Sequence, residues 1–429
     1  MTVGAGPGVA EMSDVDRAVA ARRAIEALRA GVPSRDAVAA TGSGQSAIED
    51  RFAKLCEAAA QGKPGGLLVG GGFGTGKSHL LEHLAVLALD AGFTVSRVVI
   101  SKETPLYDPA KVFAAAVESA VFADRPRPAL VEAAAALDLD GRGYAELLRW
   151  ASSAGSGLNE RFGATLSLFA HARERDATWA NAIVRFWSGD PIAVVDLRRR
   201  MKEAGDPRPS LPPVSVKELA LQRIRFAPRL LTAAGSAGWV ILFDEVELIG
   251  RYSLLQRARA YAEIARWVRG EHAGPGTPLA AVLAMTDDYE AAVITGRRDG
   301  DIVPEKLRAK QTPDATALAS AAAQGMRIID REMQVLTPPD DAELRQAYER
   351  LKQLHGEVFG WNPPDVTGIE RLGATRMRQY VRAWINEWDL CRLDSGYRPV
   401  TEIVDVTTDY REDPDLELSG VATGADASA

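Results

Sequence analysis

Cysteine is scarce in this chain, and extended hydrophobic runs are missing. Only Cys56 and Cys391 occur among 429 residues, and they provide neither a disulfide framework nor the ligand spacing of a zinc site. No stretch is typical of a secretion signal or of a membrane span. We therefore expect a protein of the reducing cytoplasm that makes no contact with a membrane.

The chain also lacks an excess of positive charge. Lys and Arg number 51 against 58 Asp and Glu, which excludes a histone-like polycation and means that any contact with nucleic acid must be local. Hydrophobic residues make up 46% and charged residues 25% of the chain. A chain of this length and composition can bury a large core, and we expect more than one domain.

A glycine-rich segment follows the apolar stretch Leu67–Val69 and fits the pattern G-x-x-x-x-G-K-[ST]. Its glycines let backbone N–H groups surround a phosphate, and the helix expected over His79–Leu89 adds its positive end to the same anion. Lys77 is expected to reach the β- and γ-phosphates of a nucleoside triphosphate, and Ser78 the Mg²⁺ ion. The candidate nucleotide-binding residues are Gly71, Gly72, Phe73, Gly74, Thr75, Gly76, Lys77, Ser78 and His79.

A second nucleotide element is the apolar stretch Trp239–Phe243, which ends in Asp244 and Glu245. This is the form of the Walker B strand of P-loop ATPases, in which the first acid holds Mg²⁺ through water. Glu245 is the candidate residue for orienting the attacking water, with Glu247 as the alternative base. The competing interpretation is a strand-end helix cap, in which Asp244 accepts backbone N–H groups.

A third apolar strand is expected over Pro278–Met285, beside the strand that precedes the glycine-rich loop. Some ATPases insert a strand between the P-loop and Walker B strands, and the polar residue at its end contacts the γ-phosphate or the water. Thr286 is our candidate for this sensor position, with Asp287 as the second choice. An N-cap or a turn is the alternative role for Thr286.

Helical spacing and turn residues divide the rest of the chain. Further strands are expected over Phe93–Ile100 and Glu332–Leu336. Helices are expected over Val15–Ala30, Ala47–Ala60, Pro109–Ala123, Leu130–Leu137, Tyr144–Ser152, Leu158–Arg175, Ile192–Met201, Tyr252–Arg269, Ala342–Val358 and in a last segment that contains Gly373–Trp384. The expected parts are a disordered start (1–13), helices flanking the nucleotide site (14–60), a core (61–337) with a helical insertion at about 125–215, a helical lid (338–406) and an acidic disordered tail (407–429).

Two features of the insertion have competing interpretations. Its aromatic residues fit a hydrophobic core better than a platform for stacking bases. The basic run Arg198–Arg200 with Lys202 fits a solvated helix face, and the alternative is a contact with nucleic acid or an acidic partner. The aromatic residues are Trp150, Phe162, Phe169, Trp179, Phe186 and Trp187.

The order of these motifs, followed by a helix that begins with Pro338-Pro339 and by a Gly-x-x-Arg helix, resembles AAA+ ATPases of the initiator-like branch. Arg22–Pro33, the core Gly74–Leu81, and Val95–Ile100 with Pro105-Leu106 are similar to the BrxD-type ATP-binding proteins of BREX bacteriophage-defence systems. This resemblance covers most of the chain from about Ala21 to Asp389.

The resemblance implies roles for three arginines. Arg376 takes the place of the lid sensor arginine, and Arg327 or Arg331 that of an arginine acting on a neighbouring subunit. A structural pairing of Arg327 and Arg331 with Asp330 or Glu332 is the alternative. Independently of the resemblance, Arg376 and Arg378 at the start of a helix oppose its dipole, and this placement is more reasonable beside a phosphate.

We therefore expect a P-loop NTPase fold of AAA+ type, an α/β/α three-layer structure with a parallel sheet, a helical insertion and a C-terminal helical lid. The expected function is Mg²⁺-dependent ATP hydrolysis in an anti-phage defence system, coupled to assembly on DNA or partner proteins. ATP rather than GTP follows from the resemblance, and no N-K-x-D string occurs in the chain. The expected partners are further copies of the chain, assembled in the presence of nucleotide, other defence-system proteins and double-stranded DNA.

Two other functions remain open from the residues. One is a slowly hydrolysing, nucleotide-gated scaffold or switch that recruits proteins without binding DNA. The other is a kinase built on the P-loop fold, for which no acceptor-site signature is evident.

Overall fold

The computed structural model describes residues 14–122, 128–205, 210–366, 377–394 and 396–397, which form two compact units. Unit 1 contains the described residues of Met1–Ser46, Gly72–His83 and Thr337–Thr407. Unit 2 contains those of Ala47–Gly71 and Leu84–Leu336. The ends expected to be disordered, residues 1–13 and 407–429, lie outside the described residues.

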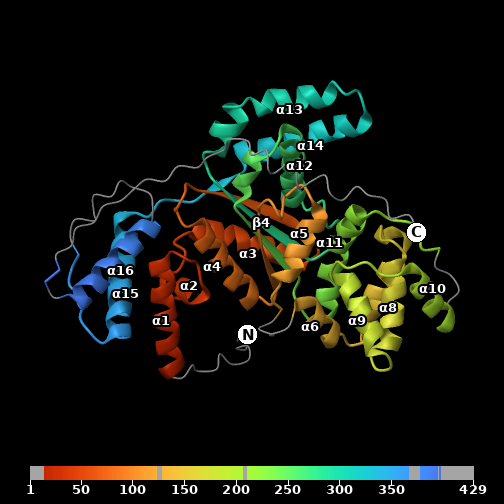
Figure 1. Ribbon diagram of the computed structural model, residues 1–429, viewed down its shortest axis with the longest axis horizontal. Coiled ribbons are helices and arrows are strands. Elements are labelled where there is room, and N and C mark those ends of the chain that lie inside the picture. The colour runs from red at the N-terminus through yellow and green to blue at the C-terminus, as the bar shows by residue number, and fades with distance from the viewer. Residues whose placement is uncertain (1–13, 123–127, 206–209, 367–376, 395, 398–429) are drawn as a thin grey trace, which may run out of the picture. The chain divides into compact units, whose positions relative to one another are not determined.

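A five-stranded parallel sheet is the centre of unit 2 (Figure 1). Its strand order is β2-β3-β4-β1-β5, so β4 lies between β1 and β3 as the sequence predicts. The strands are β1 Gly65–Gly70, β2 Thr94–Val99, β3 Trp239–Asp244, β4 Leu279–Met285 and β5 Gln334–Val335. An α/β fold with a parallel sheet is thereby confirmed, and it is consistent with a P-loop type of architecture.

The two middle strands are almost entirely buried. All seven residues of β4 are buried, and in β3 only Asp244, its last residue, is partly exposed. Strands covered on both faces read as continuous apolar runs in the sequence, which is why both were predictable. Gly66 of β1 permits close packing, because a Cβ atom there would lie 2.8 Å from the carbonyl oxygen of Trp267.

Helices surround the sheet in unit 2, and α12 contacts both β1 and β4. The α-helices of this unit are α3 Ser46–Ala60, α5 Pro109–Glu118, α6 Ala129–Ala136, α7 Arg142–Ala151, α8 Arg161–Ala172, α9 Ala177–Ser188, α10 Val194–Glu203, α11 Val216–Ala233, α12 Leu254–Arg269, α13 Asp299–Arg308 and α14 Pro313–Arg331. Shorter helical turns are η1 Ala154–Ser156, η2 Val246–Arg251 and the π-helix η3 Glu290–Thr295.

Helices α8, α9 and α10 lie together at one end of unit 2 (Figure 1). Four aromatic side chains of this region, Phe162, Phe169, Phe186 and Trp187, are buried in the same hydrophobic core as the sheet. The half-buried Trp150 and Trp179 pack against that core. The interpretation of these aromatic residues as core is therefore confirmed.

The basic run of α10 is largely engaged with nearby groups. Arg199 pairs with Asp196, and Arg200 pairs with Asp176 and lies over the ring of Trp179. Arg198 donates to the carbonyl oxygen of Ser210. These contacts are those of a solvated helix face with local partners.

Unit 1 is built from helices, with α1 Asp14–Ala30, α2 Arg35–Thr41, α15 Asp341–Phe359, α16 Met377–Leu393 and the first residues of α4 Lys77–Asp90. Its core contains apolar side chains from α1, α15 and α16, including Ile25, Leu351 and Trp388. Helix α15 begins with a capping box, in which Asp340 accepts from the backbone N–H of Glu343 and the Glu343 carboxylate accepts from that of Asp340. The helix expected after Pro338-Pro339 therefore begins as predicted.

Some elements differ from expectation. Helices α2, α9, α11, α13 and α14 were not predicted. Helix α11 contains Pro228, a residue that ordinarily argues against a helix interior. The helix expected to reach Ala123 ends at Glu118, because the chain turns and Val121 forms an antiparallel bridge to Val95 of β2. The last strand has only two residues, Gln334 and Val335.

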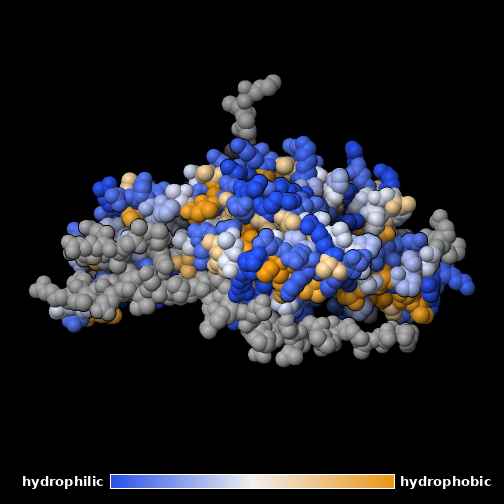
Figure 2. Space-filling view, turned by 90° about the horizontal axis from the view of Figure 1, so that it is seen from above, coloured by the Kyte–Doolittle hydropathy of each residue, from blue (hydrophilic) through white to orange (hydrophobic). Residues whose placement is uncertain are grey.

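The face drawn in Figure 2 is mostly hydrophilic, with separated hydrophobic areas. Large apolar side chains that are exposed, such as Val195 and Leu393, are distributed along the described sequence. Within the described part of the chain, no helix is long and apolar enough to cross a membrane.

Candidate nucleotide-binding site

The glycine-rich loop joins the end of β1 to the start of α4. Gly74 and Gly76 adopt left-handed backbone conformations, with φ of 81° and 109°, which side chains with a Cβ atom rarely adopt. The Thr75 hydroxyl donates to the carbonyl oxygen of Gly72 at 2.9 Å. Lys77 is 8% exposed and donates from Nζ to the same carbonyl at 3.2 Å. The loop is thus a compact turn, and its lysine side chain folds back onto the backbone of the loop.

His79 connects the first turn of α4 to the end of α2. Its Nε2 lies 2.8 Å from the carbonyl oxygen of Gly42 and 3.1 Å from the hydroxyl of Thr41. Burial lowers the pKa of His79, and a neutral ring that donates from Nε2 to Gly42 satisfies this contact. His79 therefore has a structural role within unit 1, beside the nucleotide contact that its position in the motif predicts.

The parallel sheet brings the ends of three strands to one edge. The backbone N–H of Gly71, directly after β1, donates to the carbonyl oxygen of Met285, the last residue of β4, at 3.2 Å. On the other side of β4, Phe243 pairs with Leu283, which places Asp244 at the same edge. Because neighbouring strands are about 4.8 Å apart, Asp244 lies about 10 Å across the sheet from the end of β1. Unit 2 therefore presents the second acidic element at the edge where the glycine-rich loop begins.

Glu245 has an unusual backbone. Its φ is 58°, a left-handed conformation that costs a residue with a side chain on the order of 1 kcal/mol or more. The backbone N–H of Glu245 donates to Oδ1 of Asp244 at 2.9 Å, a bond between neighbouring residues, whereas the helical turn η2 that follows has Glu245 at its N-cap position and no side-chain cap bond. Glu245 itself is exposed, whereas Glu247, the alternative base, is buried in η2. Of the two, Glu245 has the carboxylate that water reaches.

Thr286 directly follows β4 and is 1% exposed. Its carbonyl oxygen accepts from the backbone N–H of Tyr289 at 3.4 Å, so the chain turns here. Asp287, the second choice for the sensor position, is exposed. The sheet therefore places Thr286 at the same edge as Gly71 and Asp244, and in a turn.

Three arginines were expected to contribute from outside the sheet. Arg327 and Arg331 are exposed on α14, and Arg331 pairs with Asp330 at 3.2 Å. Arg376 lies outside the described residues. Arg378, at the start of α16, is half-buried, and its charge adds to the lowering of the pKa of His79. Within unit 1, Arg378 is thus a described arginine whose charge acts on the start of α4. The sequence indicated it by the unusual position of a cation at the start of a helix.

A buried polar cluster in unit 2 was not predicted. Arg257 of α12 binds Asp299 with two hydrogen bonds, and Tyr261 donates to the same carboxylate. The members are separated by up to 42 positions in the sequence, and no local pattern brings them together. The cluster adjoins the segments that follow β3 and β4.

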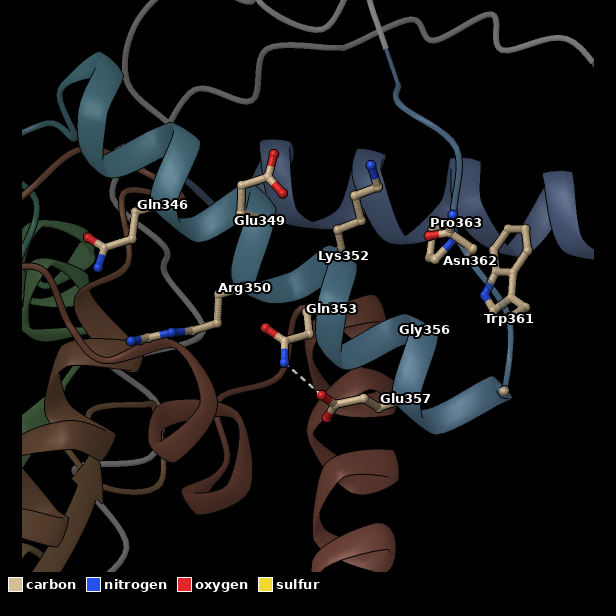
Figure 3. Close-up of a pocket in the computed structure, with 11 residues that line it drawn as sticks. Gln346, Glu349, Arg350, Lys352, Gln353, Gly356, Glu357, Trp361, Asn362 and Pro363 are labelled. Atoms are coloured by element: carbon tan, nitrogen blue, oxygen red, sulfur yellow. Dashed lines mark hydrogen bonds between the residues drawn. The ribbon is translucent and has the colours of Figure 1, made fainter.

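An open pocket of about 900 Å³ lies along α15 in unit 1 (Figure 3). Arg350 and Gln353 project from one side of the helix, and Glu349 and Lys352 from another (Figure 3). Its polar groups bind one another or their neighbours: Gln353 donates to Glu357 at 2.8 Å, and Lys352 pairs with Asp365 at 2.5 Å. A pocket of mixed charge with such internal pairs does not indicate one class of ligand.

Comparison with known proteins agrees with the resemblance seen in the sequence for the first part of the chain. Residues 17–133 match the family described as BREX system ATP-binding protein BrxC/D. The matched region includes α1, α2, the glycine-rich loop, α4 and β2. No curated protein and no solved structure matches the chain. Over residues 17–133 the chain is therefore similar to the BREX system ATP-binding proteins BrxC/D.

Proposed function

We propose that this protein is a Mg²⁺-dependent ATPase of the AAA+ class and a cytoplasmic component of an anti-phage defence system. The observation that carries the proposal is the common sheet edge, at which the glycine-rich loop follows β1, Asp244 and Glu245 follow β3, and β4 with Thr286 lies between. The family match adds ATP as the nucleotide, because the family is described as ATP-binding.

The loop and the start of α4 are suited to bind the phosphates of ATP. Gly74 and Gly76 turn the backbone without side chains that would fill the loop, and the N-terminus of α4 adds its positive dipole end. The Lys77 ammonium, now on the Gly72 carbonyl, would exchange this neutral acceptor for phosphate oxygens, which are stronger acceptors. The residues present therefore fit the triphosphate.

Ser78 and Asp244 are the residues that would hold Mg²⁺. A hydroxyl and a carboxylate are the oxygen ligands that this ion prefers. When bound, the ion neutralises the charge that develops on the phosphates. Glu245, exposed directly after Asp244, would orient the attacking water by accepting its proton, and Thr286 would contact the water or the γ-phosphate.

Arginines would complete the site. We assign the lid role to the start of α16, where Arg376 is the residue in the motif position and Arg378 the described residue whose charge reaches His79. Arg327 or Arg331 would act on the ATP of a neighbouring copy, which requires a nucleotide-dependent homo-oligomer. Hydrolysis would then move the helices of 338–406 against the core and drive assembly on double-stranded DNA or on other defence proteins.

The test is steady-state ATP turnover of the wild type and of Glu245→Gln, each with and without duplex DNA at one fixed salt concentration. Turnover that rises with DNA and falls by about a hundredfold or more in Glu245→Gln supports the proposal. Turnover that is unchanged by the substitution overturns the role of Glu245.

The alternative function is a nucleotide-gated scaffold that hydrolyses ATP very slowly and recruits proteins without binding DNA. The hydrogen bond from the Glu245 N–H to Asp244 favours it, because the carboxylate oxygen that accepts this bond is less available to a metal ion. Tight ATP binding with negligible turnover, with or without DNA, would support the scaffold and exclude assembly driven by ATP hydrolysis.

A further inference from the structure

A buried cluster joins the two segments that leave the sheet after β3 and β4. Arg257 of α12 and Asp299 of α13 form an ion pair at 2.7 Å, with side chains 3% and 1% exposed. The guanidinium binds both carboxylate oxygens, from Nε to Oδ2 and from one terminal nitrogen to Oδ1 at 3.0 Å. This bidentate geometry fixes the relative orientation of α12 and the start of α13.

The same arginine holds the segment that follows Glu245. Its other terminal nitrogen donates to the carbonyl oxygen of Tyr252 at 2.6 Å. Tyr252 follows η2, the turn that begins directly after Glu245. Arg257 thus binds the end of the segment that carries the candidate water-orienting residue.

Two tyrosines extend the cluster to the segment that follows Thr286. The Tyr261 hydroxyl donates to Oδ2 of Asp299 at 2.8 Å, and its oxygen lies 3.1 Å from the hydroxyl of Tyr289. Because the single proton of Tyr261 points to the carboxylate, Tyr289 is the donor in the second bond. Tyr289 lies three positions after Thr286, at the start of the π-helix η3.

Stability alone does not account for such a cluster. A buried ion pair gains little over well-packed apolar residues of the same volume, because both charges lose their hydration. Both segments also contain a strained residue: Glu245 has φ of 58°, and Arg298, directly before Asp299, has φ of 59°. Strained conformations persist where the surrounding contacts over-determine them. The cluster supplies such contacts at Asp299, directly after Arg298, and at Tyr252, seven positions after Glu245.

We propose that Arg257, Asp299 and Tyr261 are positioning residues that hold the Glu245 and Thr286 segments in one fixed relation. The role rests on the proposed function, since the two held residues are those assigned to water and γ-phosphate. The cluster also reaches α14, because a Cβ atom on Gly325 would collide with the carbonyl oxygen of Tyr261. Helix α14 carries Arg327 and Arg331, so its close packing on α12 at Tyr261 fixes the helix that carries the candidate trans arginines.

The test is Tyr261→Phe, which removes one hydroxyl from the cluster and keeps the ring. The matched control is Tyr144→Phe, because the buried Tyr144 hydroxyl donates to the Leu166 carbonyl on α8. Hydrogen–deuterium exchange without nucleotide is measured over Val246–Arg251 and Glu290–Thr295. We expect exchange to rise in both segments in Tyr261→Phe and in neither in the control.

Kinetics give the second readout. Tyr261→Phe should lower kcat for ATP by about tenfold while KM changes less than about twofold, because misplacement affects the reacting geometry more than binding. Arg257→Lys, which keeps the charge but loses the planar fork, should act in the same direction. Unchanged exchange in both segments, or an unchanged kcat in a protein whose wild type turns over, overturns the positioning role. Absence of turnover in the wild type overturns only the proposed hydrolysis, since the exchange experiment still decides the positioning.

Discussion

Lys77 and Gly72 are joined across the glycine-rich loop, with the lysine Nζ 3.2 Å from the glycine carbonyl oxygen. The lysine is therefore already directed into the loop, at little cost in further ordering when it binds phosphate. A pre-positioned charge of this kind contributes more to affinity than a mobile surface lysine.

We expect Lys77→Met to weaken ATP binding by about ten- to a hundredfold, the loss of one or two charge-assisted hydrogen bonds. Calorimetric titration with a non-hydrolysable ATP analogue measures this. Lys54→Met, on the exposed face of α3, is the control and should leave the affinity unchanged. Equal affinities of both variants would exclude the loop as the phosphate site.

The trans arginine is testable by mixing two inactive proteins. Arg331→Ala should lower turnover by on the order of a thousandfold if its guanidinium acts on the ATP of a neighbour. A mixture of Arg331→Ala with Glu245→Gln then regains turnover, because the intact Glu245 of one copy meets the intact arginine of the other. The same mixture with Arg327→Ala tests the second candidate. If neither mixture recovers while both single variants are inactive, neither arginine acts between copies.

The sheet was predictable because its signals are local. Trp239–Phe243 and Leu279–Met285 are apolar runs that follow a glycine or a proline and end at a polar residue, and a strand buried on both faces needs no partner to be recognised. Parallel pairing of these strands then places Asp244 and Thr286 at the same edge of the sheet. The start of α15 after Pro338-Pro339 was predictable for the same reason, since its signals lie within a few positions of one another.

Other features depend on contacts that the sequence does not display. Helix α2 has only seven residues, too few for a clear periodicity. The interior Pro228 concealed α11, in which tertiary packing outweighs the local preference. The left-handed backbone of Glu245 and the pairing of Arg257 with Asp299 arise from distant segments, so no spacing rule points to them.

Two helix glycines of unit 2 should respond oppositely to alanine. In Gly325→Ala the new methyl group would collide with the carbonyl oxygen of Tyr261, a backbone atom that cannot rotate away. We expect a loss of about 2–3 kcal/mol in the free energy of unfolding. In Gly300→Ala the methyl group meets only Ile294 Cγ2 at 3.8 Å, so the higher helix propensity of alanine should add about 0.5–1 kcal/mol. Chemical denaturation of both variants measures the difference, and a neutral Gly325→Ala would contradict the close packing of α12 on α14.

We expect His355 to make the stability of unit 1 depend on pH. Its Nδ1 accepts from the Trp361 indole N–H at 3.0 Å, and its Nε2 donates to Asp389 at 3.2 Å. An Nδ1 that accepts a hydrogen bond carries no proton, so the folded ring is neutral. Burial, the largest effect, lowers the pKa of His355 below its usual 6.5, and the charges of Arg392 and Arg29 lower it further against the opposing effect of Asp389.

The direction of the change in stability with pH follows from the number of protons bound in the folded and in the unfolded state. Between the two pKa values the unfolded chain binds a proton at His355 that the folded chain does not, so stability rises with pH there. The contribution is fully present above pH 6.5 and is lost as the pH falls through the lowered folded value.

His355→Gln keeps a donor for Asp389 but cannot titrate. The free energy of unfolding of the wild type should therefore fall more than that of His355→Gln between about pH 7.5 and about pH 5.5. His79 titrates in both proteins, so the difference between them isolates His355, and His171→Gln on the exposed face of α8 is the matched control. Parallel pH profiles of the wild type and His355→Gln would show that folding does not lower the pKa of His355.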